Sequence, residues 1–124
     1  LFWRICPFMK KIVTLKKNYE FQRLYKKGKF YVGKYLVLYV KENKLNINRI
    51  GITTSRKFGN SVKRNRVRRL IRESYRYYEK YLKVGYDFVF VARSTEDLPA
   101  YTDIKKEMKY LLKKNSVFDM EKWN

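Results

Sequence analysis

The chain has 124 residues, enough for about one domain, and 45% of them are hydrophobic, which excludes a chain that is disordered throughout. It carries 31 Lys and Arg residues against 11 Asp and Glu residues, a formal net charge of +20. Because so many cations cannot be neutralised within the chain, we expect a polyanionic partner, with nucleic acid as the first candidate and a membrane surface as its rival. No stretch approaches the roughly 20 apolar residues that span a bilayer.

The beginning of the chain differs in composition from the rest. Residues 1–8 are apolar apart from one arginine, and they lack the long apolar run and small-residue cleavage site of a signal peptide. We therefore expect an N-terminal extension over residues 1–8, a single domain over 9–118 and a C-terminal tail over 119–124. Cys6 is the only cysteine, so no internal disulfide can form, which agrees with a reducing, cytoplasmic location.

The first half of the chain predicts one helix and then two strand regions. Asn18 is the expected N-cap of a short helix, and Gly28 is its expected end. Residues 30–40 are typical of a strand region interrupted near Gly33, and residues 47–54 form a second β-rich run. The residues at helical spacing in the first helix are Phe21, Leu24 and Tyr25.

The second half predicts a long helix, a buried strand and a last helix. Residues 61–81 should form the long helix, with Gly85 ending it, and residues 87–92 are apolar enough for a central strand buried on both faces. Thr102 is the expected cap of the last helix. The expected buried face of the long helix is Val67, Leu70, Ile71, Ser74, Tyr75 and Tyr78. That of the last helix is Ile104, Met108, Leu111 and Leu112. The order αβββαβα predicts an α+β sandwich with helices against one sheet.

The long helix carries the most informative charge pattern. Seven of the fourteen residues from Lys63 to Arg76 are basic, and six of these are Arg, whose rigid fork of donors matches phosphate geometry. Glu73 is the only acid in this stretch, and like charges four residues apart cost an isolated helix roughly 0.2–0.5 kcal/mol per pair. We interpret this face as a phosphate-binding surface; the alternative is a solvated basic face. Projected at 100° per residue, the face opposite the buried one contains Asn65, Arg68, Arg69, Arg72 and Arg76.

The start of the long helix adds a second feature. Gly59, Asn60 and Ser61 supply backbone N–H groups at the positive end of the helix dipole, where anions are stabilised. Most Gly-Asn-Ser sequences are simply turns, so this feature gains weight only beside the basic residues that follow.

The stretch from Arg56 to Glu73 resembles the signature of the ribonuclease P protein family. Its hallmark is an Arg-Asn-Arg triplet, here Arg64, Asn65 and Arg66, followed by further basic residues and an Arg-Glu pair. The similarity extends over about residues 15–114 and does not include residues 1–8.

In that family the RNA subunit is the catalyst, and it removes the 5′ leader of precursor tRNA with magnesium ions. The resemblance therefore implies an RNA-binding subunit of an endoribonuclease, with no catalytic residue and no bound cofactor or metal of its own. The absence of His and the scattering of the 11 acids along the chain agree with this role. The implied partners are the ribonuclease P RNA subunit, in a 1:1 holoenzyme, and precursor tRNA, with no membrane partner.

The resemblance also implies two binding surfaces. The residues expected to contact the catalytic RNA are Lys57, Asn60, Lys63, Arg64, Asn65, Arg66, Arg68, Arg69 and Arg72. The residues expected to hold the single-stranded leader in a cleft between the first helix and the sheet are Phe21, Tyr25, Tyr39, Lys57 and Arg93. The alternative for the three aromatic residues is an ordinary core.

The resemblance further implies a particular fold, a four-stranded mixed sheet with a left-handed β-α-β crossover around the long helix. Such proteins are similar in this respect to the second domain of small-subunit ribosomal protein five. Most β-α-β crossovers are right-handed, so this expectation comes from the resemblance alone.

Three other functions remain as alternatives. A ribosomal-type protein or RNA chaperone would also be small and basic, but it would not need a leader cleft. A stand-alone nuclease would cleave precursor tRNA without an RNA subunit. A membrane-surface protein would prefer anionic vesicles to structured RNA.

Overall fold

The computed structural model describes residues 12–55, 57–95 and 97–123. The predicted extension over residues 1–8, Cys6 and Arg56 lie outside this part of the chain. The elements in chain order are α2 Asn18–Lys27, β1 Lys29–Val32, β2 Leu36–Glu42, β3 Arg49–Thr54, α3 Ser61–Tyr78, the 3-10 helix η1 Glu79–Tyr81, β4 Tyr86–Ala92, α4 Tyr101–Lys114 and α5 Met120–Trp123. The predicted order αβββαβα is confirmed, with a short helix added inside the predicted C-terminal tail.

The four strands form one mixed sheet in the order β1-β2-β4-β3. The central strand β4 is antiparallel to β2 and parallel to β3. Its apolar run is buried at most positions, as the sequence predicts for a central strand. Gly33 lies in the turn between β1 and β2, where the predicted strand region is interrupted.

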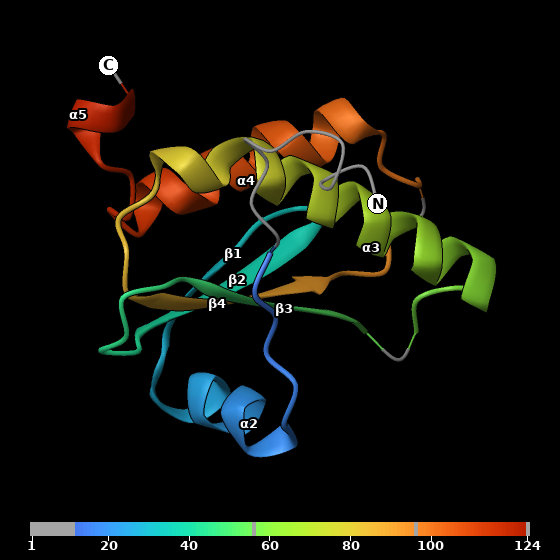
Figure 1. Cartoon of the computed structure of the whole chain (residues 1–124). Coiled ribbons are helices and arrows are strands. Elements are labelled where there is room, and N and C mark those ends of the chain that lie inside the picture. Colours follow the sequence, from blue (N-terminus) through green and yellow to red (C-terminus); the bar gives the residue numbers. More distant parts are fainter. Residues whose placement is uncertain (1–11, 56, 96, 124) are drawn as a thin grey trace, which may run out of the picture.

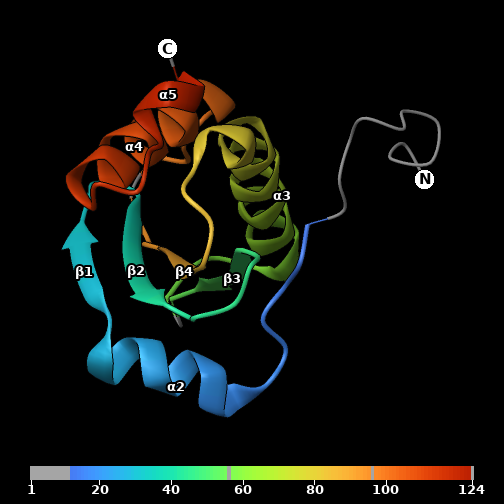
Figure 2. The ribbon, with the colours of Figure 1, turned by 60° about the vertical axis from the view of Figure 1, so that its left-hand side comes forward.

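The two faces of the sheet have different covers. Helices α3 and α4 pack on one face, and α2 lies on the other (Figures 1 and 2). The side chains of β4 divide accordingly: Phe88 and Phe90 belong to the main core under α3 and α4, whereas Val89 belongs to a small cluster with Leu15 and Leu24 on the α2 side. The sheet is therefore the middle layer of three.

The connection from β3 through α3 to β4 is left-handed. In Figure 1 both strands run from left to right, and α3 returns from right to left above the sheet. In Figure 2 the left-hand side has come forward and β3 lies to the right of β4, so β3 is the nearer strand in Figure 1. A path that runs right along the near strand, left above the sheet and right along the far strand turns counter-clockwise as it recedes. This is the rare hand expected from the resemblance.

The predicted buried faces of the two long helices are confirmed. Every residue expected on the inner faces of α3 and α4 is buried, most of them completely. The single polar member, Ser74, donates its hydroxyl hydrogen to the Leu70 carbonyl at 2.9 Å, so its burial leaves no donor unpaired. The period of the apolar residues was therefore sufficient to orient both helices.

The predicted helix ends need three corrections. The N-cap of α2 is Lys17 and not Asn18, and the N-cap of α4 is Ala100 and not Thr102. In both helices an acid at the third helical position reaches back to the N–H group of the N-cap residue, Glu20 at 3.0 Å and Asp103 at 2.9 Å. This is the half of a capping box that the acid makes; neither Lys17 nor Ala100 offers a side-chain cap of its own.

The third correction concerns the end of the long helix. Its α-helical part stops at Tyr78, and residues 79–81 continue as the tighter helix η1. The N–H group of Leu82 then donates to the Glu79 carbonyl at 3.1 Å, and the chain leaves the helix several residues before Gly85.

Helix α2 is tied to the sheet by one arginine. The guanidinium of Arg49 on β3 donates to both carboxylate oxygens of Asp87 on β4, at 2.8 Å each, and to Glu20 on α2 at 2.7 Å. Asp87 is buried and also accepts the Asn43 side-chain amide at 2.9 Å. A bidentate, partly buried pair is stronger and geometrically more specific than an ordinary surface ion pair.

Close packing of a ring on backbone provides the second attachment. A Cβ atom placed on Gly51 of β3 would lie 2.5 Å from Cε1 of Phe21, so the ring of Phe21 sits directly on this glycine. A glycine inside a strand permits such an approach. Leu15 and Leu24 fill the space beside the ring.

We predict that Glu20→Gln lowers the free energy of unfolding by about 0.5–1 kcal/mol at neutral pH, and that this loss shrinks in acid. The N–H group of Lys17, together with Arg49, lowers the pKa of Glu20 below its ordinary value of 4.5. Its contribution is therefore complete above that value and is lost as the pH falls through the lowered pKa of the folded state. Urea unfolding near neutral pH and in acid measures the difference. The exposed Glu42→Gln is the control, and a pH-independent loss in E20Q would contradict the prediction.

Gly51→Ala should destabilise the chain by about 1–3 kcal/mol, because the new methyl group overlaps the Phe21 ring in a packed site. Gly59→Ala is the matched control. Its Cβ atom would meet the flexible Lys63 side chain, which can move aside, so its effect should stay within about 0.5 kcal/mol. Thermal unfolding of the two variants compares their losses of stability. Equal losses would show that contact with the Phe21 ring does not exclude a side chain at position 51.

Candidate RNA interface

The outer face of α3 is the first candidate surface, and it is narrower than the sequence predicts. Asn65, Arg69 and Arg72 are exposed on it. Arg68, at the edge of this face, and Arg76, in the last turn of the helix, are half-buried. The Nε atom of Arg76 is buried without a hydrogen-bond partner in the described part of the chain. The projection at 100° per residue therefore placed Asn65, Arg69 and Arg72 correctly but overestimated the exposure of the other two residues.

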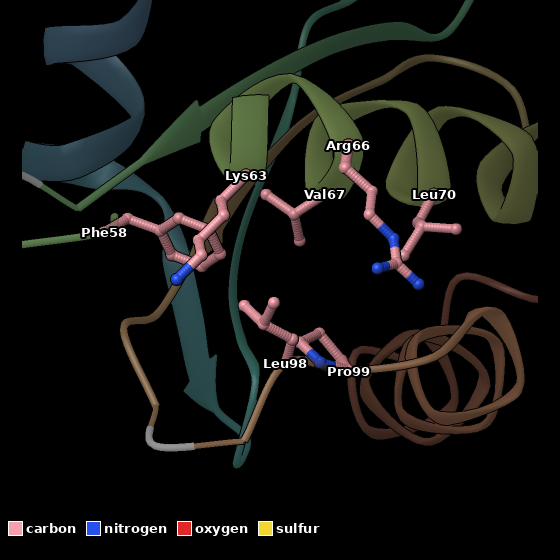
Figure 3. A pocket seen from close by; sticks show the side chains of 7 residues that line it. All are labelled: Phe58, Lys63, Arg66, Val67, Leu70, Leu98 and Pro99. Carbon is pink, nitrogen blue, oxygen red and sulfur yellow. The ribbon is translucent and has the colours of Figure 1, made fainter. Parts of the chain in front are cut away.

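The Arg-Asn-Arg triplet does not form one patch. Asn65 points outward, while Arg64 turns back at the start of the helix, where its Nη1 donates to the Gly59 carbonyl at 3.3 Å. Arg66 lies with Lys63 on the flank toward α4, beside a shallow hollow (Figure 3). The apolar lining of this hollow comes from α3 and from the loops beside it: Phe58, Val67, Leu70, Leu98 and Pro99.

The N-terminus of α3 is capped, and it carries positive charge. The side-chain oxygen of Asn60 accepts the N–H group of Lys63 at 3.0 Å, so this residue, expected to contact RNA, serves as the helix cap. The first turn has no acidic residue, although this end of a helix favours negative charge. Basic side chains at the positive end of the helix dipole are unfavourable until an anion arrives.

The arginines of α3 also lack acidic partners. No ion pair joins Arg64, Arg66, Arg68, Arg69 or Arg72 to another residue within the described ranges. By contrast, Arg49 in the sheet binds two carboxylates. Of these, Arg66, Arg69 and Arg72 are exposed, so their guanidinium groups can donate to an external anion.

The second candidate surface lies on the opposite face of the sheet, beside α2. Three aromatic rings from α2, β1 and β2 meet there. The ring of Tyr39 lies 5.0 Å from that of Tyr25, edge to face, and 5.5 Å from that of Phe30, measured between centroids. Tyr25 remains 36% exposed and Phe30 57% exposed, so this cluster is not an ordinary core. Desolvation by partial burial, followed by the neighbouring Tyr39, raises the pKa of Tyr25 above its ordinary value.

Phe21 differs from the other two predicted aromatic residues. Its ring is half-buried against Gly51 and the small cluster of Leu15 and Leu24. The packing alternative therefore describes Phe21 well and Tyr39 in part, because Tyr39 packs on the same cluster. Tyr25 is the most exposed of the three rings.

Beyond α2 the same face of the sheet continues as an open strip. The register aligns Val32, Val37, Val91 and Thr53 across all four strands. The middle pair is half-buried, and Val32 is 56% exposed at the edge. An apolar strip that crosses all four β-strands, next to aromatic rings, suits an extended single strand of nucleic acid.

Lys57 and Arg93 lie where the two surfaces approach each other. Arg93 directly follows β4, and Lys57 lies in the loop between β3 and α3. The hydroxyl of Ser94 donates to the Lys57 carbonyl at 3.1 Å and links the two segments. Both cations are exposed. In Figure 1 this is the right-hand end of the sheet, the end at which α3 begins.

The described ranges lack two other kinds of site. They contain no group of three or more His, Cys, Asp or Glu residues that could hold a metal ion. They also contain no helix long and apolar enough to cross a bilayer.

Three residues of the site were missed by sequence reasoning. Phe30 completes the aromatic cluster, Gly51 seats Phe21, and Arg49 fixes α2. Gly51 carried a usable signal, because a glycine within an alternating strand pattern often marks close approach of another group. Arg49 carried none, since its partners Glu20 and Asp87 come from distant parts of the sequence. Phe30 lies in the predicted strand region, but its pairing with Tyr39 depends on the register of β1 with β2.

Comparison with known proteins agrees with this geometry. The chain matches the family model described as Ribonuclease P over residues 9–116. A ribonuclease P protein component of Natranaerobius thermophilus is 48% identical over 109 residues, covering 88% of this chain and 95% of that protein. One from Clostridium botulinum strain Loch Maree is 47% identical over 106 residues, covering 85% and 96%.

A solved structure shows the same fold. The RNase P protein of Staphylococcus aureus superposes with a TM-score of 0.79 and 34% identity, covering 88% of this chain and all of that one. The family model spans most of the chain, and these relatives are matched over nearly their whole length. The chain therefore belongs to the ribonuclease P protein family, as the RNA-binding protein subunit of that endoribonuclease.

Proposed function

We propose that the chain binds two RNAs on two surfaces that approach each other at one end of the sheet. The outer face of α3 binds the ribonuclease P RNA subunit, and the open sheet face beside α2 binds the 5′ leader of precursor tRNA. The observation that carries the proposal is the position of Lys57 and Arg93 between the α3 arginines and the aromatic strip.

The α3 surface fits the backbone of a folded RNA. Its exposed guanidinium groups have no carboxylate partners within the described ranges, and Arg binds phosphate through two parallel hydrogen bonds. The basic first turn of α3 also favours a bound phosphate. An RNA phosphate would relieve the repulsion among these cations, which gains affinity and also stabilises the helix.

The sheet surface fits a single strand of RNA. Unpaired bases stack on aromatic rings, and such stacking tolerates any sequence. The ring centroids of Tyr25 and Phe30 lie 5.0 and 5.5 Å from that of Tyr39, and the strip around Val37 and Val91 continues the apolar surface. Leaders differ in sequence from one precursor to the next, so a sequence-tolerant surface is the appropriate one.

The role that these residues support is positioning. Lys57 and Arg93 would hold the backbone where the leader passes toward the RNA subunit, and the cleavage chemistry, with its magnesium ions, belongs to that RNA. One protein and one RNA subunit in a 1:1 cytoplasmic complex suffice for this arrangement, because each surface occurs once per chain.

Tyr25→Ala should lower the affinity of the holoenzyme for precursor tRNA about tenfold and leave mature tRNA binding unchanged, because only the precursor carries a leader to stack. The chain is first combined with a bacterial ribonuclease P RNA at low magnesium, where it should restore precursor cleavage. Binding of both tRNAs is then measured for each variant.

Tyr110→Ala is the matched control, since Tyr110 is 55% exposed on α4, away from the sheet face. Equal losses for precursor and mature tRNA in Y25A would favour a general RNA-binding protein. Failure of the parent chain to restore cleavage would refute the proposal as a whole.

Arg72→Ala should weaken binding to the ribonuclease P RNA in a salt-dependent manner. Each lost phosphate contact should reduce the slope of log K against log salt by roughly 0.7–0.9. Lys113→Ala removes an exposed charge of the same sign from α4 and should leave the slope unchanged. An unchanged slope in R72A would show that Arg72 makes no phosphate contact.

A further inference from the structure

One acidic side chain on α4 organises the turn between β1 and β2. The carboxylate of Glu107 accepts three consecutive backbone N–H groups, those of Lys34 at 2.8 Å, Tyr35 at 2.7 Å and Leu36 at 2.6 Å. Three short, charge-assisted bonds to one carboxylate make a rigid attachment across more than 70 positions of sequence. Few other side chains of this chain bind so much backbone.

Gly33 is what allows this approach. A Cβ atom on Gly33 would lie 2.6 Å from Cδ and 2.8 Å from Oε2 of Glu107. The carboxylate therefore lies directly against the backbone of the turn, and any larger residue at position 33 would displace it. The absence of a side chain at Gly33 therefore leaves the space that the Glu107 carboxylate occupies.

The same turn holds Arg93 from its other side. Nη1 of Arg93 donates to the Gly33 carbonyl at 2.6 Å, and its backbone N–H donates to the Tyr35 carbonyl at 2.8 Å. A guanidinium has five N–H donors, and the bond to Gly33 uses one of them. The side chain is exposed at the end of the open sheet face, so further donors can reach a phosphate.

We propose that Glu107 is a positioning residue for the leader. It fixes the turn at residues 33–36, the turn fixes the guanidinium of Arg93, and Arg93 holds the leader backbone at the end of the sheet face. This inference rests on the proposed leader-binding function. Three N–H groups stabilise the charged carboxylate and hold it against the turn.

The test compares two ways of releasing the turn. Glu107→Ala removes the carboxylate, and Gly33→Ala pushes it aside while leaving it in the chain. Asp103→Ala is the matched control: Asp103 is an acid on the same helix, four residues before Glu107, and it accepts the N–H group of Ala100 instead of those of the turn. Binding of precursor and mature tRNA to the holoenzyme is measured for each variant, with thermal unfolding alongside.

Glu107→Ala and Gly33→Ala should each reduce the preference for precursor over mature tRNA about two- to fivefold, the range for one exposed charged contact. Arg93→Ala should give the same loss, and E107A combined with R93A should give no more than R93A alone. Asp103→Ala should keep the full preference even where it lowers the melting temperature as much as E107A does.

These outcomes distinguish a failure of the inference about Glu107 from a failure of the proposed leader contact of Arg93. If R93A reduces the preference while E107A and G33A do not, or if the losses multiply in the double variant, Glu107 does not act through Arg93 and the inference fails alone. If R93A itself has no effect, the leader contact assigned to Arg93 is wrong and the inference falls with it. Should E107A fold too poorly to measure, G33A, which retains every buried group, decides between these outcomes.

Discussion

The whole arrangement depends on β4 being covered on both faces by layers of different character. Alternate side chains of a strand point to opposite faces, so Phe88 and Phe90 enter the core under α3 and α4 while Val89 and Val91 face α2. A slip of one residue would exchange the two sets and place valines where the core needs aromatic rings. The parallel register with β3 then brings the start of α3 to the end of the sheet from which Arg93 emerges. The two candidate surfaces therefore lie on opposite sides of one sheet, one on α3 and the other on the sheet face beside α2.

The element order, the buried faces of α3 and α4 and the central strand could be predicted because each depends on a periodic pattern within a short window. The helix caps could not be predicted in the same way, since Glu20 and Asp103 act from inside the helices and displace the caps expected at Asn18 and Thr102. The side of the sheet on which α2 packs could not be predicted from the periodic pattern either. It depends on Gly51 and Arg49, whose partners lie some 30 positions or more away along the chain.

For the candidate site, the residue types were more predictable than their geometry. Consecutive residues of a helix point about 100° apart, so Arg64, Asn65 and Arg66 must face three directions. The structure turns Arg64 back to Gly59 and sets Arg66 beside the hollow near Pro99, while Asn65, Arg69 and Arg72 share the exposed face. The three residues of this sequence motif therefore lie in three different environments of the folded chain. The contacts assigned to these residues and to the leader cleft stay predictions.

The edge strand β1 has a consequence for the behaviour of the free protein. Phe30, Tyr31 and Val32 are all exposed on a strand with one side unpaired, which is the arrangement through which sheets of different molecules join. Repulsion between chains of charge +20 opposes that joining, with Lys29 and Lys34 at the two ends of the strand. Salt shortens the reach of this repulsion to about 3 Å at 1 M, while apolar contact is unaffected or strengthened. The concentrated protein without RNA should therefore self-associate as salt rises, the reverse of its dependence on salt for binding RNA.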